Sequence, residues 1–375
     1  MSERKTPKLS TQRLLWGMTA GRCEKCGRLI YRHPLGDTIG NFAQVAHNNP
    51  VGKRGPRAEY KKLNHNEDVD RVENLLLLCY DCHREIDFER PSDFSPSLLT
   101  KMKHDFEEFI IQSTNKETCS PSIVIRYSPN LHDKRLKIVD IRNALFPDKY
   151  VKEEFELNLQ NSAVYPGDGT DYWELEERNL VRNFTKIEAR IDDVKFSDTD
   201  ISVFSIGPIP LLAKLGELLS NKRKIDVYQL KKTPPSWKWD GNLDSIEYRV
   251  SEIQKVPNCK NIILILSLSG KISLNDVRSS IDFDIGSIYE ISINNPNDDY
   301  LRTKQHLDDF VNAYRLVREL IVSGHGKDMT IHIFAAVPVS VAVEIGRHRN
   351  PSSDPPAIVY NYNRNKYTKG VTLGR

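Results

Sequence analysis

The sequence predicts an α+β module near its N-terminal end, followed by an α/β region built from two related halves. Two Cys-x-x-Cys pairs fall within the first 90 residues, a spacing typical of a zinc-stabilised module. Beyond about residue 120, apolar segments typical of strands alternate with amphipathic segments typical of helices. A stretch that begins at Phe204 is similar to one that begins at Phe334, which indicates an internal duplication.

Length and composition place the chain among globular proteins. Its 375 residues suffice for two or three domains. A hydrophobic content of 39% and a charged content of 28% exclude disordered, collagen-like and coiled-coil proteins. No apolar run approaches the roughly 18 to 20 residues that cross a bilayer, and the first residues lack the apolar segment of a signal peptide. We therefore expect a cytoplasmic protein with no membrane partner.

Four of the six cysteines form two close pairs, Cys23 with Cys26 and Cys79 with Cys82. Disulfides are disfavoured in a cytosolic chain, so the pairs predict one structural Zn²⁺ held by four thiolates. A redox pair or a chance spacing is the alternative. The other two, Cys119 and Cys259, are expected to be buried apolar groups or idle thiols.

His47, Asn74 and His83 occur in this order between and after the cysteine pairs, and Asn74 begins an Asn-Leu-x-x-Leu-Cys motif that ends at Cys79. Over about residues 20–90, this arrangement resembles the HNH endonuclease family. The resemblance implies a ββα-metal fold of two strands and a helix around one divalent cation, Mg²⁺ or Mn²⁺. It also implies hydrolysis of DNA phosphodiester bonds.

Each of these residue types suits a step of that hydrolysis. An imidazole titrates near pH 6.5, so His47 is the candidate general base, and His83 is placed to hold the catalytic metal. Asn74 would fix the loop that carries His47, and Asp87, one helical turn after His83, would orient its ring. Because Ala46 stands where many family members have a metal ligand, we expect His83, phosphate oxygens and water to hold the metal. The alternative is a zinc module that binds without cutting.

Basic residues gather between His47 and Asn74. Residues 1–90 carry 16 Lys or Arg against 12 Asp or Glu, whereas the rest of the chain is nearly neutral. The candidate DNA-binding residues are Lys53, Arg54, Arg57, Lys61 and Lys62. Such a cluster suits a phosphate backbone, although it is also typical of a solvated loop. No base-reading element is visible, so we expect little sequence preference.

A connecting segment separates the two regions. Residues 95–112 have the apolar periodicity of an amphipathic helix, and residues 113–122 have the composition of a linker. We therefore divide the chain into a zinc-bound module at 1–90, a connection at 91–121 and an α/β domain at 122–375.

The duplication lies within the α/β domain. Residues 204–216 align with residues 334–346, with Phe, Pro and Gly coinciding, and each copy leads to a Val-Tyr strand. This predicts two Rossmann-type half-domains, about 122–240 and 241–375, with a ligand held between them. Convergent use of a common unit is the alternative. Strands are expected at 122–127, 201–206, 225–230, 261–267, 287–293, 330–335 and 357–362, and helices at 211–219, 303–323 and 339–347.

The second copy, residues 331–346 with Val359 and Tyr360, is similar to the C-terminal core of the SAVED domain. The resemblance extends over about residues 122–375. It implies two fused CARF-like units that sense cyclic oligonucleotides in bacterial anti-phage signalling (CBASS). Together the two resemblances imply a dormant enzyme. A cyclic di- or trinucleotide would drive it into a homo-oligomer, a dimer or an active tetramer, which degrades double-stranded DNA.

The sequence also offers candidate ligand-binding residues. Trp237 and Trp239 follow the strand that carries Tyr228, where an aromatic lid could cover a purine. Two turns, at residues 205–208 with Ser205 and at 335–338 with Pro338, lead into helix N-termini, which favour phosphates. The alternative is that the tryptophans belong to the core.

Two other functions fit parts of this pattern. One is a restriction-type HNH nuclease that depends on DNA modification, but the nearly neutral C-terminal region argues against it. The other is a zinc-stabilised nucleotide sensor without catalysis, in which His47→Ala would change nothing.

Overall fold

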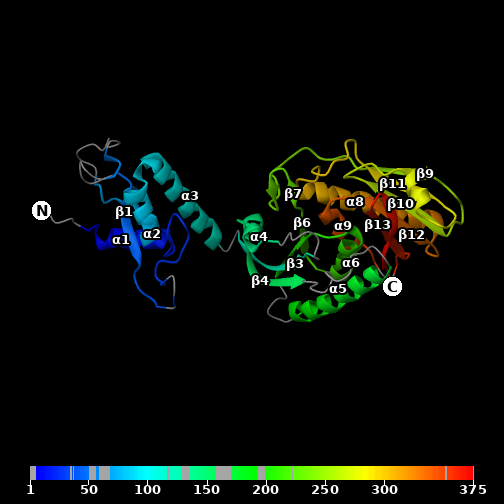
Figure 1. Ribbon diagram of the computed structural model, residues 1–375, viewed down its shortest axis with the longest axis horizontal. Coiled ribbons are helices and arrows are strands. Elements are labelled where there is room, and N and C mark those ends of the chain that lie inside the picture. Colours follow the sequence, from blue (N-terminus) through cyan, green and yellow to red (C-terminus); the bar gives the residue numbers. More distant parts are fainter. Residues whose placement is uncertain are drawn as a thin grey trace. The chain divides into compact units, whose positions relative to one another are not determined.

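The computed structural model describes residues 6–33, 36, 38–49, 56–58, 68–115, 119–128, 136–157, 170–192, 199–221, 223–350 and 353–374. The chain forms two compact units, Met1–Cys119 and Ser120–Arg375 (Figure 1). Among the described residues, no helix is both long enough and apolar enough to span a membrane.

The first unit is built on a short antiparallel hairpin. Strand β1 (Ala43–His47) pairs with β2 (Leu75–Cys79), with His47 opposite Leu75. Every side chain of β2 is buried, because its apolar run packs into the core of the unit. The helical elements are α1 (Leu9–Met18), η2 (Val72–Asn74), α2 (Tyr80–Arg84), the π-helical turn η3 (Glu85–Glu89), η4 (Pro91–Asp93) and α3 (Pro96–Thr114).

Helix α3 confirms the amphipathic helix predicted at 95–112, and it packs on the first unit. Ser95 caps it by accepting a hydrogen bond from the Leu98 amide at 3.3 Å. Lys103 donates to the buried Glu24 carboxylate at 3.2 Å, and Glu24 also accepts from the Leu77 amide at 2.6 Å. These bonds join α3 to β2 and to the first cysteine pair.

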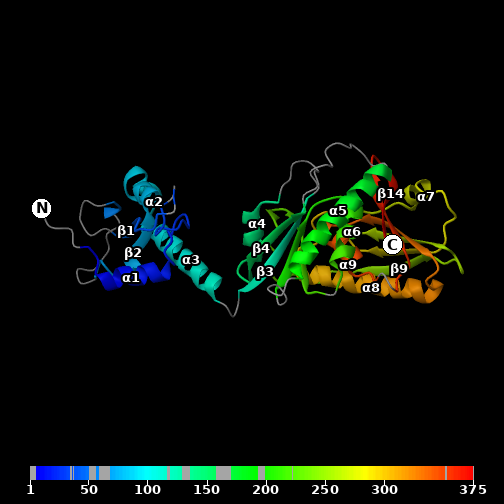
Figure 2. The ribbon, with the colours of Figure 1, turned by 90° about the horizontal axis from the view of Figure 1, so that it is seen from below.

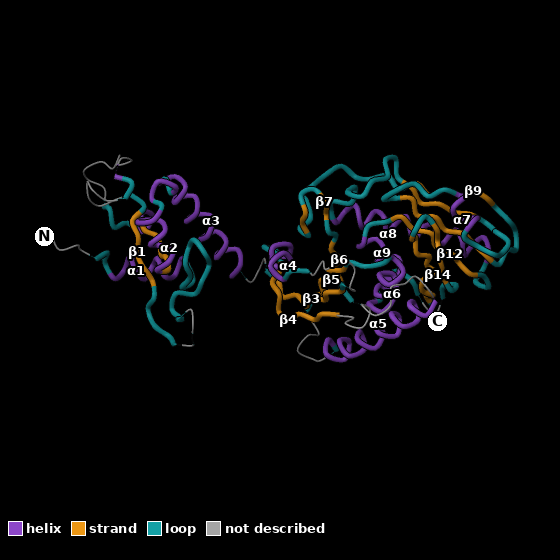
Figure 3. The backbone as a smooth tube through the Cα atoms, viewed as in Figure 1, coloured by secondary structure: helices purple, strands orange, loops and turns teal. Residues whose placement is uncertain are grey.

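In the described part of the second unit there are two large sheets and a separate two-stranded ribbon (Figure 3). The first is fully parallel, in the order β4-β3-β5-β6. Its elements are β3 (Ser120–Tyr127), α4 (Ile138–Leu145), β4 (Lys149–Leu157), α5 (Thr170–Ile191), β5 (Asp200–Ser205), α6 (Ile209–Leu219) and β6 (Ile225–Tyr228), followed by the ribbon of β7 (Lys231–Lys232) and β8 (Pro235–Ser236).

The second sheet has the order β14-β13-β12-β10-β11-β9, with four parallel strands between antiparallel edges. Its elements are β9 (Arg249–Gln254), β10 (Asn261–Ser267), α7 (Leu274–Ser279), β11 (Ile288–Ser292), α8 (Lys304–His325), β12 (Thr330–Ala336), α9 (Val339–Arg347), β13 (Ala357–Asn363) and β14 (Lys366–Leu373). The two central strands, β10 and β12, are mostly apolar because both of their faces are buried.

Helices α6 and α9 join the two halves. They lie side by side (Figures 1 and 2) and cross at a pair of glycines. A Cβ atom on Gly216 would lie 1.8 Å from the carbonyl oxygen of Val343, and one on Gly346 would lie 1.8 Å from that of Ala213. Gly216 and Gly346 occupy the same position in the two aligned copies, so the crossing has the internal symmetry expected of a duplicated unit.

Candidate functional site

The four cysteines of the two pairs meet at one place in the first unit. All their sulfur atoms lie within 4.8 Å of one another. The Cys26 and Cys79 sulfurs are 3.8 Å apart, and a tetrahedral zinc with Zn–S bonds of about 2.3 Å would separate its sulfurs by about this distance. Burial raises the pKa of Cys23 to about 11 and also raises that of Cys82, and a bound cation would hold these two thiols ionised. The donor set therefore fits Zn²⁺.

His47 ends β1, and Asp70 orients its ring. Its Nε2 lies 2.8 Å from Asp70 Oδ1. Because a carboxylate only accepts hydrogen bonds, Nε2 carries the proton and Nδ1 carries a lone pair that can take a proton from water. No sequence motif marks Asp70, which lies 23 residues along the chain from His47.

His83 lies in α2, and Asp87 lies one turn later in η3. Their closest approach is 3.3 Å, between Nε2 and Oδ2, which is the predicted i, i+4 contact. By the same argument Nε2 donates, which leaves Nδ1 of His83 free to bind a cation. Burial raises the pKa of Asp87, but hydrogen bonds from His83 and Arg57 outweigh it and hold that pKa below its usual value.

Arg57 connects the two histidines, which corrects its assignment as a DNA-binding residue. Its side chain is 2% exposed. The guanidinium donates to the backbone carbonyl of His47 at 3.0 Å and to Asp87 at 2.7 Å. It also donates to the carbonyls of Asn48 and Ile86. Four of its five N–H donors are engaged in this way and the side chain is buried, so it is poorly placed to bind a phosphate. The other four basic candidates, Lys53, Arg54, Lys61 and Lys62, lie outside the described residues.

His47 and His83 together are called the two-histidine site. Asn74 holds the chain on both sides of this site. Its Oδ1 accepts from the backbone amide of Asn49 at 2.8 Å, and its Nδ2 donates to the carbonyl of Val69 at 2.9 Å. Its own carbonyl accepts from the Asn48 amide at 2.8 Å. These bonds position the segment after His47 and the segment before Asp70. Asn74 therefore acts on the site by positioning other residues.

The second unit has a cavity of about 610 Å³ at the carboxyl ends of its strands. Residues after β5, β10 and β12 line it, as do the first residues of α6 and α9. This is where ligands bind in open α/β sheets. Charged lining residues of both signs are present, namely Lys232, Lys271, Asp276 and Asp298. Lys232 pairs with Asp298 at 2.5 Å, whereas Lys271 forms no ion pair with any residue in the described part of the chain.

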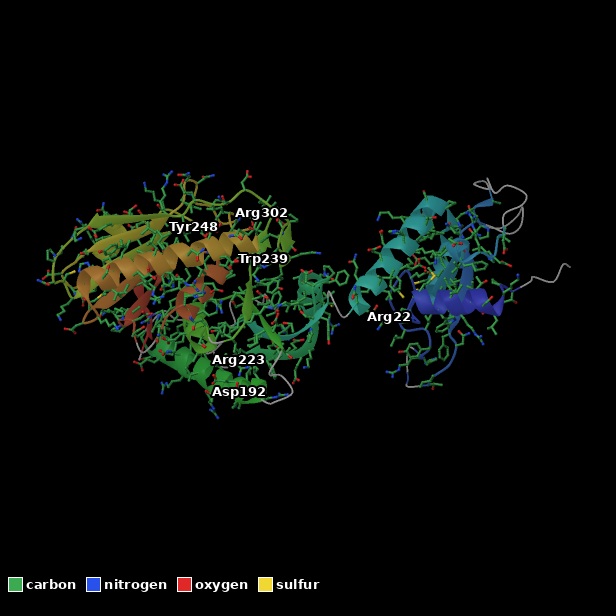
Figure 4. All side chains as sticks on the ribbon, turned by 180° about the vertical axis from the view of Figure 1, so that it is seen from behind. Arg22, Asp192, Arg223, Trp239, Tyr248 and Arg302 are labelled. Carbon is green, nitrogen blue, oxygen red and sulfur yellow. The ribbon has the colours of Figure 1, made fainter. Side chains whose placement is uncertain are left out.

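Only one of the five predicted ligand-binding residues lines this cavity. Pro338 does, at the start of α9, but Ser205, Tyr228, Trp237 and Trp239 do not. Ser205 is fully buried, at the end of β5. Trp239 lies near Arg302 (Figure 4). The neighbouring residue, Asp240, accepts a hydrogen bond from Arg302 Nε at 2.6 Å, and this segment lies outside the cavity lining.

Trp237 and Tyr228 belong to the core, which corrects the predicted aromatic lid. Phe204 stacks on Tyr228 at 4.4 Å between ring centroids and meets Trp237 edge-on at 5.4 Å. In the other half, Phe334 stacks on Tyr360 at 4.2 Å and meets Tyr367 edge-on at 5.1 Å. Trp237 is 4% exposed, so no face of its ring is open to a purine.

An exposed aromatic ring does reach the cavity, from the opposite half. Tyr362, at the end of β13, is 50% exposed and lines the cavity together with Tyr367. In the structure Tyr367 meets Phe334 edge-on, as Trp237 meets Phe204 in the other half, so the two side chains occupy equivalent places. Which copy presents its aromatic side chains to the cavity was decided by the packing of the two halves.

Comparison with known proteins identifies the C-terminal region. Residues 185–373 match the family model of the SMODS-associated and fused to various effectors sensor domain (SAVED). No curated protein matches the chain.

Two solved structures are similar to part of the chain. The Cap4 SAVED/CARF-domain containing receptor of Acinetobacter baumannii, with the cyclic trinucleotide 3′3′3′-cAAA, has a TM-score of 0.45 and 13% identity over 76% of this chain and 61% of that one. The Cap4 receptor of Moraxella osloensis has a TM-score of 0.40 and 14% identity over 74% and 58%. The chain thus spans about three fifths of the length of these receptors.

The family model covers half of the chain and includes both helices of the glycine crossing and all the residues that line the cavity. The protein therefore belongs to the SAVED sensor-domain family.

Proposed function

We propose that this protein is a cyclic-oligonucleotide-activated, metal-dependent endonuclease of bacterial anti-phage (CBASS) defence. The SAVED unit would bind the messenger, and the first unit would cut double-stranded DNA with little sequence preference. The observation that carries the proposal is the cavity of about 610 Å³ between the two duplicated halves of a SAVED-family sensor domain.

The chemistry of the cavity supports a cyclic oligonucleotide as its ligand. Its volume falls within the range of small-molecule sites, about 300 to 1,000 Å³. Tyr362 offers an exposed ring for stacking on a base. Lys271, which lacks an ion-pair partner among the described residues, offers a positive charge for a phosphate. Helices α6 and α9 both begin at the cavity, and their N-termini favour anions.

The two-histidine site of the first unit supports phosphodiester hydrolysis. Nδ1 of His47 is the acceptor that can remove a proton from water, since Asp70 engages Nε2. Nδ1 of His83 would hold the divalent cation, which supplies positive charge to the phosphate in the transition state. Arg57 joins the His47 backbone to Asp87 and so sets the spacing of the two rings.

Activation requires the messenger to favour one arrangement of the protein over another. A ligand shifts a conformational or assembly equilibrium only by the difference in its affinity for the two states. We therefore propose that the messenger promotes a homo-oligomer, a dimer or a tetramer. Two first units in one assembly would provide two sites, one for each strand of a DNA duplex.

The test uses the purified full chain, plasmid DNA, Mg²⁺ or Mn²⁺, and a panel of cyclic di- and trinucleotides. We expect one of the nucleotides to raise cleavage at least 100-fold. His47→Ala should abolish cleavage but leave nucleotide binding and zinc content unchanged, whereas Lys271→Ala should weaken binding at least tenfold. His104→Gln, on the exposed face of α3, is the matched control for the histidine variant.

Other outcomes would overturn the proposal. Cleavage that no nucleotide stimulates, or that depends on DNA methylation, would favour a modification-dependent restriction nuclease. Nucleotide binding without cleavage, unaffected by His47→Ala, would favour a sensor without catalysis.

A further inference from the structure

A second cluster of reactive side chains lies in the second sheet, at the end of the parallel strands opposite the cavity. Cys259 directly precedes Lys260 and β10, and Ser287 directly precedes β11. Tyr289 lies in β11, Glu252 lies in β9, and His325 is the last residue of α8. The cluster is thus at the amino ends of the parallel strands, whereas the cavity is at their carboxyl ends.

Hydrogen bonds determine which nitrogen of His325 carries the proton and which one offers a lone pair to the thiol. Tyr289 donates to Glu252 Oε2 at 3.0 Å, because a carboxylate only accepts. The Tyr289 oxygen, 3.1 Å from Nε2 of His325, must therefore accept, so Nε2 carries the proton. Nδ1 of His325 then presents its lone pair to Cys259 Sγ at 3.7 Å, and the Ser287 hydroxyl oxygen, 3.8 Å from Sγ, is the other acceptor for the thiol proton. Burial and the Glu252 carboxylate raise the pKa of Tyr289 to about 12, which keeps the phenol a donor.

The surroundings also favour the ion pair that proton transfer would produce. The backbone amide of Ser287 donates to Cys259 Sγ at 3.3 Å, and this bond strengthens when sulfur is negative. His325 ends a helix of 22 residues, where the helix dipole favours a protonated imidazole. A thiol with an oriented base and a main-chain donor is the arrangement of an activated nucleophile.

Space and access also suit a reaction at this sulfur. A Cβ atom on Gly286 would lie 2.5 Å from Cys259 Sγ, so only glycine leaves room for the thiol there. Cys259 and His325 are partly exposed, and the residues on either side of Cys259 are exposed. Cys119, in contrast, is 5% exposed.

We propose that Cys259 is an activated thiol and a site of oxidation by hydroperoxides. The thiol proton passes to Nδ1 of His325, and the thiolate attacks one oxygen of the hydroperoxide. A sulfur–oxygen bond forms as the oxygen–oxygen bond breaks. The leaving oxygen takes the proton from His325 and departs as an alcohol, or as water when the oxidant is hydrogen peroxide. Sulfur loses two electrons to the peroxide and becomes a sulfenic acid.

The experiment treats the zinc-loaded full chain with hydrogen peroxide, traps sulfenic acid with dimedone, and maps the label by mass spectrometry. We expect Cys259 to react at least tenfold faster than N-acetylcysteine at the same pH, and far faster than Cys119. His325→Gln should slow labelling at least tenfold, and Tyr289→Phe should slow it less. His104→Gln should leave the rate unchanged, and Cys259→Ser should remove the label.

Two results would overturn the proposal. One is labelling of wild-type Cys259 no faster than N-acetylcysteine, a comparison that needs no variant to fold. The other is a folded His325→Gln variant, with wild-type thermal unfolding, that reacts at the wild-type rate. The test requires neither DNA cleavage nor nucleotide binding, so its result is independent of the proposed function.

Discussion

The histidines show how neighbouring groups set the protonation of a single side chain. In His47, His83 and His325 a hydrogen-bond partner holds the proton on Nε2, so the lone pair is on Nδ1, which in His325 faces Cys259 Sγ. His332, in β12, is different because both of its nitrogens are engaged. Nδ1 lies 3.1 Å from the Tyr360 hydroxyl, and Nε2 lies 3.2 Å from Asn261 Oδ1. Burial, with a smaller contribution from the charge of Lys369, lowers the pKa of His332 to about 4.

His332 should make the stability of the second unit depend on pH. Its pKa is lower in the folded state than in the unfolded chain, so the unfolded chain binds the proton first as pH falls. The contribution of the neutral His332 ring to the free energy of unfolding is complete above about pH 6.5 and is lost progressively as the pH falls towards 4. We expect His332 to lower the free energy of unfolding by about 2 kcal/mol between pH 7.5 and pH 5.

Urea denaturation of the full chain at the two pH values tests this expectation. His332→Gln should remove about that much of the pH dependence, and His104→Gln, which is exposed, should not. An unchanged pH dependence in His332→Gln would contradict the assignment.

At the scale of elements, the α6–α9 crossing depends on the absence of two side chains. Each glycine lies against the backbone of the facing helix, and backbone atoms cannot rotate away as the end of a flexible side chain can. The apolar residues around the crossing, such as Leu212 and Val343, are fully buried. A methyl group at either glycine must therefore separate the helices and with them the two halves.

Gly216→Ala should lower the free energy of unfolding of the second unit by about 3 kcal/mol, because overpacking forces backbone shifts. Gly324→Ala in α8 is the matched control. Its Cβ would meet only the Tyr289 hydroxyl, at 3.8 Å. It should be neutral or stabilise by up to about 1 kcal/mol, since alanine has the higher helix propensity. Equal stabilities for the two variants by denaturant titration would refute the proposed close contact.

The strands that the sequence predicted are mostly rich in buried apolar residues. All seven are present, as β3, β5, β6 and β10–β13, and the apolar runs of β3, β5, β10 and β12 mark strands that are buried on both faces. Strands β4, β9 and β14 were missed, since edge strands carry charged and exposed residues and depend on a partner strand. Helix α5 was also missed, although Leu180, Phe184 and Ile187 have helical spacing.

At the scale of the whole molecule, each compact unit has its own apolar core. The core of the first unit includes Leu15, Leu76 and Leu99, whereas one core extends across both sheets of the second unit. The first unit, Met1–Cys119, is the smaller of the two and is built on one short hairpin, so it has little apolar surface to bury. We therefore expect metal binding to contribute much of its folding free energy.

Chelation should unfold the first unit selectively. We expect one Zn²⁺ per chain to be released by a strong chelator, with loss of protease resistance in residues 1–119 and survival of a fragment that begins near residue 120. Cys79→Ser should give the same proteolysis pattern without a chelator. Cys119→Ser is the matched control and should retain the metal, because Cys119 is not part of the four-cysteine cluster. Full protease resistance after removal of all metal would show that zinc is not structural.

Residue types and their spacing predict which side chains can carry chemistry, because motifs are read directly from the covalent order of the chain. The spacing of the two close pairs was enough to predict that Cys23, Cys26, Cys79 and Cys82 share one site, and the structure brings their sulfur atoms together. The catalytic roles of His47, Asn74 and His83 stay predictions. Tertiary structure alone decided that Arg57 is buried between His47 and Asp87, that Asp70 orients His47, and that Tyr362 rather than Trp237 reaches the cavity. It also decided that Cys259, which the sequence marked as idle, lies against an oriented imidazole. These outcomes depend on contacts between residues far apart in the chain, and local sequence does not encode such distances.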